Sequence, residues 1–266
     1  MKSPTTIPDA RDLLLDLYSA ATAAAAPGPA LQARLLRLPE DPKRRIWIFA
    51  LGKAALPMAS TAVGVLQPDR GRLAGGVIVA PDGTTSPHPR LTLALGDHPE
   101  PGSRSLLAAE AVADTAARVK PDDEVWVLLS GGTTSLIGAP ERGLTPANLQ
   151  SLYSVLLGSG LDITAMNQIR KRFSRWGAGR LARALYPALV RVYIVSDVIG
   201  DDLPSIGSGP CVPDPTTAGD IRVLLQRAAL WPKIPEAARR MILSVESGET
   251  AETPKPGDQA FARVTL

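Results

Sequence analysis

Five short apolar runs, separated by stretches with helical periodicity, are the feature that most restricts the fold of this sequence. They are rich in Val, Ile and Leu and lie at 46–51, 76–80, 91–95, 125–129 and 192–196. Continuous apolar runs of this length are typical of parallel strands that are covered on both faces. Their alternation with helices predicts an α/β protein, a three-layer domain with a mainly parallel sheet. In such a domain, ligands bind at the carboxyl ends of the strands.

Apolar residues at helical spacing lie before, between and after these runs. The first such segment contains Leu13, Leu14, Leu17 and Ala21; Thr6 or Asp9 is its predicted cap, and the prolines of 26–30 end it. A second helix is expected to begin between Ala54 and Pro57. The other predicted helices are 102–119, 146–158, 163–176, 177–186, 218–230 and 235–247.

Composition excludes several classes of function. The hydrophobic fraction of 45% and charged fraction of 21% are those of an ordinary globular protein. A net charge of +3 without a long basic run argues against a nucleic-acid partner. One cysteine, Cys211, and two histidines provide neither a disulfide nor zinc-ligand spacing. There is no signal peptide, and the alanine-rich segment 19–30 is too short to span a bilayer, so we expect a cytoplasmic protein without a membrane partner.

Gly52 and Lys53 lie where the strand 46–51 turns into the next helix. Helix amides and a lysine at the carboxyl end of a strand suit a phosphoryl group, with the ammonium acting as a point charge. The segment is not a P-loop, because Ala54 stands where that motif has Ser or Thr. On this segment alone, a solvated surface lysine is the favoured interpretation.

A glycine-rich turn follows the strand 125–129 in the segment LLSGGTTSL (128–136). Gly131 and Gly132 allow the backbone to approach a ligand closely, and Thr133 to Ser135 add hydroxyls and amides at a helix start. The segment suits a phosphate or carboxylate. A simple turn with hydroxyl caps is an interpretation of similar weight.

Two later segments carry clustered charges. In the helix 163–176, Asn167 and Lys171 lie one turn apart on a polar face that could bind an anion, although a solvated basic face is the commoner outcome. The strand 192–196 ends in Ser196 and Asp197, and two further aspartates follow Gly200. Carboxylates at this position can hold Mg²⁺, orient a hydroxyl or accept its proton. Aspartate also forms turns and caps helices, but three aspartates are more than one turn requires, so a functional role is favoured.

Other enzyme signatures are missing from the sequence. No G-x-S-x-G segment is present, so an α/β-hydrolase lacks its nucleophile. No G-x-G-x-x-G follows any predicted strand, which weakens a dinucleotide-dependent function. His98 lies in a proline-rich loop, where a structural or supporting role is expected rather than that of a general base.

Together and in this order, these segments resemble the glycerate 2-kinase family, whose second domain is known as MOFRL. The resemblance covers the chain from about Asp9 to its end. It rests on GKAALPMA (52–59), HPEP (98–101), LLSGGTTSLIGAP (128–140), MNQIRKRFS (166–174), SDVIGDD (196–202), SGPCVPDPTT (208–217) and ETPKPGD (252–258).

The resemblance implies a Rossmann-like domain that faces a second domain, with MgATP and D-glycerate meeting in the cleft between them. Lys53 and Asp197 match the catalytic lysine and aspartate of the family, and Asp201 and Asp202 are candidates to hold Mg²⁺. The residues assigned to substrate or nucleotide binding are Gly52, Ser130, Gly131, Gly132, Thr133, Ser135, Asn167, Lys171, Ser196 and Gly200.

Three departures from the family pattern affect fine positioning: Arg172 stands where many relatives have histidine, Ile199 where they have proline, and Cys211 near a usual threonine. The resemblance assigns 1–250 to the kinase N-terminal domain and 251–266 to a linker and the start of a missing C-terminal MOFRL domain, which is expected to pack on the cleft. A third catalytic residue, an arginine, belongs to that domain. We therefore expect little or no kinase activity from residues 1–266 alone.

Two other functions remain open at this point. Relatives have often been named hydroxypyruvate reductases, and the same three-carbon acid would occupy the same pocket. A domain that binds ligand without turnover is the non-enzymatic alternative. The sequence leaves the choice between a monomer and a homodimer open.

Overall fold

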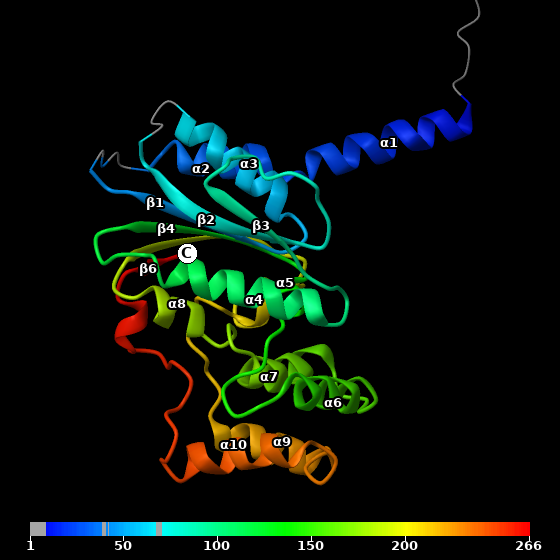
Figure 1. Cartoon of the computed structure of the whole chain (residues 1–266). Helices are drawn as coiled ribbons and strands as arrows, with labels where there is room; N and C mark the ends of the chain where they lie inside the picture. Colours follow the sequence, from blue (N-terminus) through cyan, green and yellow to red (C-terminus); the bar gives the residue numbers. More distant parts are fainter. Residues whose placement is uncertain (1–8, 39–40, 42, 68–70) are drawn as a thin grey trace, which may run out of the picture.

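A six-stranded sheet with all strands parallel forms the centre of the protein (Figure 1). The computed structural model describes residues 9–38, 41, 43–67 and 71–266. The strands are β1 (Ile46–Leu51), β2 (Leu73–Ala80), β3 (Leu91–Leu95), β4 (Glu124–Ser130), β5 (Leu189–Val195) and β6 (Val264–Thr265). Their spatial order is β3-β2-β1-β4-β5-β6, so the winding reverses between β1 and β4. The predicted α/β fold with a parallel sheet is confirmed.

Helices cover both faces of this sheet and also form a third group apart from it (Figure 1). Helices α2 (Pro27–Leu35) and α3 (Ala55–Leu66) cover one face, and α4 (Ser103–Ala116), α5 (Thr133–Leu136) and α8 (Arg180–Leu185) lie on the other. The third group consists of α6 (Pro146–Leu157), α7 (Ile163–Phe173), α9 (Ala218–Arg227) and α10 (Glu236–Glu246). Two short 3₁₀ turns, η2 (Ile206–Ser208) and η3 (Gln259–Phe261), lie outside these groups.

Three apolar cores correspond to these groups. β1 is buried at every position and contributes alternate side chains to the cores on both faces of the sheet, as a covered parallel strand must. Leu152, Phe173, Leu225 and Ile242 belong to a third core that the group of α6, α7, α9 and α10 encloses by itself. This helical group is therefore a small packing unit attached to the sheet.

The N-terminal helix α1 (Ala10–Ala24) extends away from the body and has no buried residue (Figure 1). Asp9 caps it by accepting a hydrogen bond from the Arg11 amide, as predicted, whereas Thr6 lies outside the described residues. The prolines that were expected only to end it also start α2, because Pro27 occupies the first turn. None of the described helices combines the length and the apolar character needed to cross a membrane.

Some element boundaries differ from the predicted ones. β2 begins at Leu73 rather than 76, because Leu73 and Gly75 pair with Ile46 and Trp47 of β1. Glycine lies at 75 because the Trp47 ring approaches there: a Cβ on Gly75 would lie 2.9 Å from it. β5 begins at Leu189, and Arg191 is accommodated there because its Nε lies 2.8 Å from Glu124 Oε1 on β4. Helix α8 begins only at Arg180, because Gly179 adopts a left-handed conformation with φ of 78°.

The segment 251–266, predicted to be a linker and the start of another domain, lies against this domain. Glu252 pairs with Arg172 at 2.7 Å, and Val264 in β6 pairs with Val190 in β5. This segment therefore adds the last strand of the sheet. The assignment of a second domain beyond it remains a prediction.

Candidate active site

The loops after β1 and β4 meet at the point where the strand order reverses, which is where open α/β sheets bind ligands. The Lys53 amide donates to the Gly131 carbonyl at 2.9 Å, and the Ala54 amide donates to Ser130 Oγ at 3.0 Å. Gly52 has a φ of 120°, and a Cβ there would lie 2.3 Å from Ser130 Oγ. The close approach of the two loops therefore requires glycine at this position.

Lys53, Asp197 and His98 come from three different loops and converge on Gly131 and Gly132. A Cβ on Gly131 would lie 2.0 Å from Asp197 Oδ2. A Cβ on Gly132 would lie 3.1 Å from His98 Cδ2 and 3.2 Å from Lys53 Cε. The structure thus places the predicted lysine and aspartate beside the same two glycines, and these glycines leave the space that the three side chains share.

The charges of Lys53 and Asp197 are not neutralised by ion pairs. Both side chains are exposed, and within the described part of the chain neither forms a salt bridge or a side-chain hydrogen bond. Burial lowers the pKa of His98, the positive charge of Lys53 lowers it further, and the negative charge of Asp197 opposes this shift. The pKa of His98 therefore lies below its ordinary value, which favours the neutral imidazole.

The hydroxyls of the glycine-rich turn hold the loops together instead of facing a ligand. Thr133 Oγ1 is buried and donates to the carbonyls of Leu51 at 2.9 Å and Ser130 at 2.8 Å. Ser130 Oγ accepts the Ala54 amide, and Ser135 Oγ lies 3.4 Å from the Gly132 carbonyl. The hydroxyls of these three residues are therefore engaged within the protein. Only their backbone groups are available for the predicted binding of substrate or nucleotide.

The loop after β5 carries the remaining polar candidates. Ser196 Oγ accepts the Val198 amide at 3.1 Å, so this hydroxyl stabilises the turn that presents Asp197. Gly200 has a φ of 81° with open space around its Cα, and Asp201 is exposed. The Ser205 hydroxyl donates to the carboxylate of Asp202. The described residues contain no preformed group of three or more potential metal ligands.

The structure separates the two candidates on α7. Asn167 is half-buried, and its side chain forms no hydrogen bond with any described residue. Lys171 is buried, and its Nζ lies 2.9 Å from Asp214 Oδ1. The predicted solvent-facing polar face of this helix is thus wrong at Lys171, because the helical group folds over it and Asp214 satisfies its charge. This position does not favour the predicted role in anion binding.

His98 is the residue of this site that the sequence analysis placed in a supporting role. Its loop position did not reveal that the chain returns to the carboxyl end of β4, where the imidazole lies beside Lys53. The segment HPEP, which carries part of the family resemblance, was the signal that could have identified it.

The chain also matches a known protein family. Residues 13–243 match a family described as a domain of unknown function, DUF4147. The chain belongs to this family. DUF4147 is the N-terminal domain of glycerate kinases, and the predicted family resemblance is confirmed.

Several curated proteins are similar to this DUF4147 chain along most of its length. A protein of Agrobacterium vitis named "Putative hydroxypyruvate reductase" is 37% identical over 94% of this chain and 54% of its own length. The glycerate 2-kinase of Pyrococcus horikoshii is 35% identical over 80% of this chain and 47% of its own length. The D-glycerate 2-kinase of Thermotoga maritima is 32% identical over 92% of this chain and 55% of its own length. The chain spans about half the length of these relatives.

The same likeness holds in three dimensions. The crystal structure of a Thermotoga maritima glycerate kinase superposes with a TM-score of 0.79 at 31% identity, over 96% of this chain and 57% of that one. A crystal structure of a Pyrococcus horikoshii protein superposes with the same TM-score at 32% identity, over 94% of this chain and 58% of that one.

Proposed function

We propose that this DUF4147 domain carries the catalytic lysine and aspartate of a glycerate 2-kinase, which transfers the terminal phosphoryl group of ATP to the C2 hydroxyl of D-glycerate. The observation that carries the proposal is the convergence of Lys53 and Asp197 on Gly131 and Gly132, where neither charge forms an ion pair with a described residue. Phosphoryl transfer requires positioning and charge neutralisation from the protein more than covalent chemistry. Two unpaired charges beside a glycine turn meet that requirement.

Each side chain has a distinct role in this proposal. Asp197 orients the C2 hydroxyl of glycerate and accepts its proton as the oxygen attacks phosphorus. The Lys53 ammonium offsets negative charge on the transferring phosphoryl group or on the glycerate carboxylate. Neutral His98 borders the same space and can donate or accept one hydrogen bond there.

Magnesium fits this site only as an ion that arrives with the nucleotide. Mg²⁺ usually keeps several waters and binds one or two carboxylates together with substrate phosphates. The proposal assigns the carboxylates of Asp201 and Asp202 to this task, directly or through water. When bound, the ion neutralises charge on the phosphates.

Hydroxypyruvate reduction is the second candidate, favoured by the name of the Agrobacterium vitis relative. The strand order is also that of dinucleotide-binding domains. Against it, Gly52 alone follows β1 where the dinucleotide fingerprint has three spaced glycines. The missing fingerprint therefore favours the kinase.

One pair of assays tests the proposal on protein expressed from the complete reading frame and on residues 1–266. ADP release with D-glycerate and MgATP is compared with NADH oxidation by hydroxypyruvate. We expect glycerate-dependent ADP release from the complete protein and little from residues 1–266. NADH oxidation without ADP release would establish the reductase instead, and ligand binding without either reaction would leave a binding domain.

A further inference from the structure

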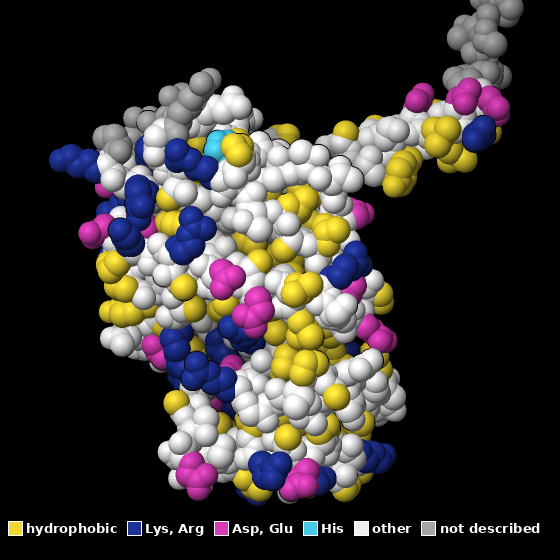
Figure 2. Space-filling view, in the orientation of Figure 1, with side chains coloured by type: hydrophobic (Ala, Val, Ile, Leu, Met, Phe, Trp, Pro, Cys, Tyr) yellow, Lys and Arg dark blue, Asp and Glu magenta, His cyan; other side chains and the backbone are white. Residues whose placement is uncertain are grey.

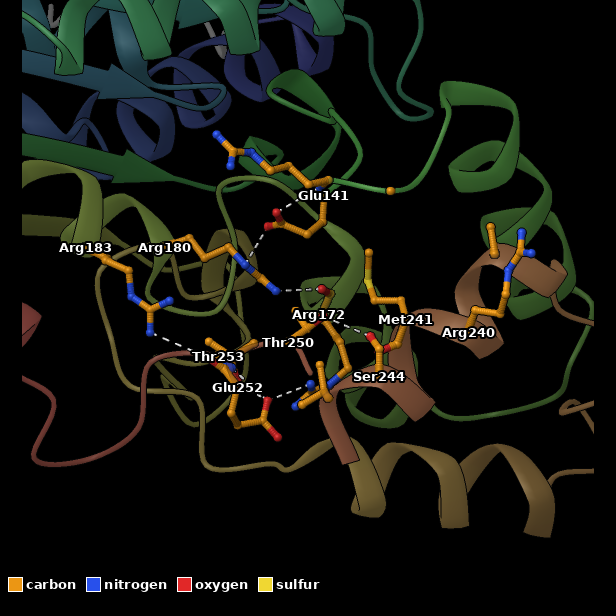
Figure 3. Close-up of a pocket in the computed structure, with 15 residues that line it drawn as sticks. Glu141, Arg172, Arg180, Arg183, Arg240, Met241, Ser244, Thr250, Glu252 and Thr253 are labelled. Atoms are coloured by element: carbon orange, nitrogen blue, oxygen red, sulfur yellow. Dashed lines mark hydrogen bonds and ion pairs between the residues drawn. The ribbon is translucent and has the colours of Figure 1, made fainter. Parts of the chain in front are cut away.

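A cavity of about 460 Å³ lies between α8 and α10, and none of its lining residues belongs to the candidate active site (Figure 3). One wall comes from residues 141–143 and α8, and the other from α10 and residues 250–253. The cavity thus lies at the junction between the sheet and the helical group. Its volume is within the range of cavities that hold small organic ligands. We call it the arginine pocket.

Five arginines and two glutamates line the arginine pocket. The arginines are Arg142, Arg172, Arg180, Arg183 and Arg240, and the glutamates are Glu141 and Glu252. Figure 2 shows Lys and Arg side chains gathered where the sheet meets the helical group. A cavity lined with an excess of one sign of charge concentrates ions of the opposite sign.

Two of these arginines are fixed in the wall. Arg180 Nε lies 2.7 Å from Glu141 Oε2, and its other nitrogens donate to backbone carbonyls that include Lys171 and Arg172. Arg172 pairs with Glu252 at 2.7 Å and is almost fully buried. Both guanidinium groups are therefore engaged by the protein and form part of the wall.

The other three arginines can turn toward a ligand. The side chain of Arg142 forms neither an ion pair nor a hydrogen bond with any described residue. Arg240 is 72% exposed and lies 3.5 Å from Glu236, which is equally exposed, so this pair is weak. Arg183 is 45% exposed and bonds Asp258 through one nitrogen at 3.2 Å, which leaves its other donors available.

The remaining wall is apolar with a hydroxyl edge. Ala237, Met241 and Val245 present one side of α10 to the cavity, and Ser244 and Thr250 share a hydrogen bond of 3.1 Å at its border. A purely inorganic anion would not use this apolar wall. A ligand with an apolar body and an anionic head would contact both kinds of surface.

We propose that the arginine pocket binds a small organic phosphate monoester, with the phosphate among Arg142, Arg183 and Arg240 and the organic group against Met241 and Val245. Guanidinium groups bond phosphate oxygens in pairs. Arg183 and Arg240 lie on opposite sides of the cavity in Figure 3, so their exposed side chains would rotate toward a phosphate bound between them. The site is separate from Lys53 and Asp197, and the proposal does not depend on the kinase assignment.

Calorimetric titration with phenyl phosphate tests this proposal, with phenol and inorganic phosphate as probes that each contain only one half of the ligand. We expect phenyl phosphate to bind more tightly than either half. Arg142→Gln and Arg240→Gln should each weaken binding about tenfold, the effect of one lost charge-assisted contact. Arg227→Gln removes an equivalent exposed charge on α9 and should leave binding unchanged, as should Lys53→Ala.

The outcomes separate this pocket from the candidate active site. Loss of phenyl phosphate binding in Lys53→Ala, with binding retained in Arg142→Gln and Arg240→Gln, would place the ligand at the strand ends and overturn the proposal. Absence of binding at millimolar concentration, or equal weakening in Arg142→Gln and Arg227→Gln, would also overturn it. Circular dichroism of each variant verifies that the fold is retained.

Discussion

Two groups of charged side chains in this domain differ in whether each charge has a partner. We call the first group the Asp214 cluster. Lys171 and Asp214 are both buried, and Lys171 Nζ lies 2.9 Å from Asp214 Oδ1. Lys255 and Arg172 each have a nitrogen 3.8 Å from the same carboxylate. At the strand ends, Lys53 and Asp197 are exposed, and neither is paired with any residue that the structure describes. Paired charges stabilise the domain, whereas unpaired charges beside a glycine turn are available to a ligand.

The physical reason lies in the cost of removing a charge from water. A buried ion must be paired and hydrogen-bonded, so the Asp214 carboxylate also accepts from Thr216 and Thr253, each at 2.8 Å. This network joins α7, the loop before α9 and the segment 252–255. An exposed ion bears no such cost and requires no partner. The comparison therefore predicts opposite consequences for substitutions in the two groups.

The largest expected effect on stability comes from Asp214→Asn. It leaves Lys171 as a buried cation without a counterion, and we expect the free energy of unfolding to fall by about 3–5 kcal/mol. Urea denaturation measures this change. Asp201→Asn, the matched exposed control, should change it by less than about 0.5 kcal/mol. Equal stabilities of the two variants would contradict the comparison, and Lys171→Met added to Asp214→Asn should restore part of the loss.

Lys53→Met and Asp197→Asn should show the reverse pattern in the protein expressed from its complete reading frame. Removal of one group that stabilises transition-state charge typically lowers kcat by about 10²–10³-fold. We expect a loss of this size in glycerate-dependent ADP release, with urea denaturation within about 0.5 kcal/mol of the unsubstituted protein. Near-normal turnover in either variant would remove that residue from the proposed mechanism.

Acid should lower the free energy of unfolding through Asp214 at pH values below the ordinary pKa of an aspartate carboxyl group. Burial raises the pKa of Asp214, but the charge of Lys171 and hydrogen bonds from Lys171 and Thr216 outweigh it, so the folded-state pKa lies below 3.8. The stability from this lowered pKa is therefore fully present above pH 3.8 and is lost as pH falls through the folded value. Unfolding free energy measured against pH should fall more steeply in this range for the unsubstituted protein than for Asp214→Asn. Parallel curves would exclude Asp214 as the cause.

The smallest expected effect is on the pKa of His98, and it has opposite signs in two variants. Lys53→Met removes a positive neighbour and should raise the pKa of His98, whereas Asp197→Asn removes a negative one and should lower it further. An NMR titration measures both shifts, and His88, the second of two histidines, is the internal control. Shifts of the same sign, or equal shifts at His88, would show that the three side chains do not share a site.

Much of the fold was predictable because parallel strands covered on both faces leave a local signal. The run 46–51 coincides with β1, since every position of this central strand is buried. The run 91–95 coincides with β3, although only Leu91 is buried in this edge strand. The less accurate boundaries were those where a local rule was overridden by a distant residue. Arg191 belongs to β5 because Glu124 on β4 neutralises it.

From the residues alone, the candidate site was predictable as separate segments at strand ends, and the family resemblance implied that Lys53 and Asp197 share one cleft. Lys53, the turn at Gly131 and Gly132, and Asp197 each had a plausible structural alternative in the sequence, because a surface lysine, a glycine turn and an aspartate at a strand end are all common. Recognition of their order along the chain supplied the family. Their convergence, and the position of His98 among them, followed from the reversal of strand order between β1 and β4.

Local periodicity and residue type were sufficient for the α/β architecture, because burial of a strand or helix face restricts residues that are close in the sequence. The pairing of charges was decided by the tertiary structure alone. Lys171 and Lys53 were both predicted to bind an anion, yet Asp214, 43 positions beyond Lys171 in the chain, neutralises Lys171, and no described residue neutralises Lys53. The energy of an ion depends on solvent exposure and on partners at a few ångströms, and only folding determines both.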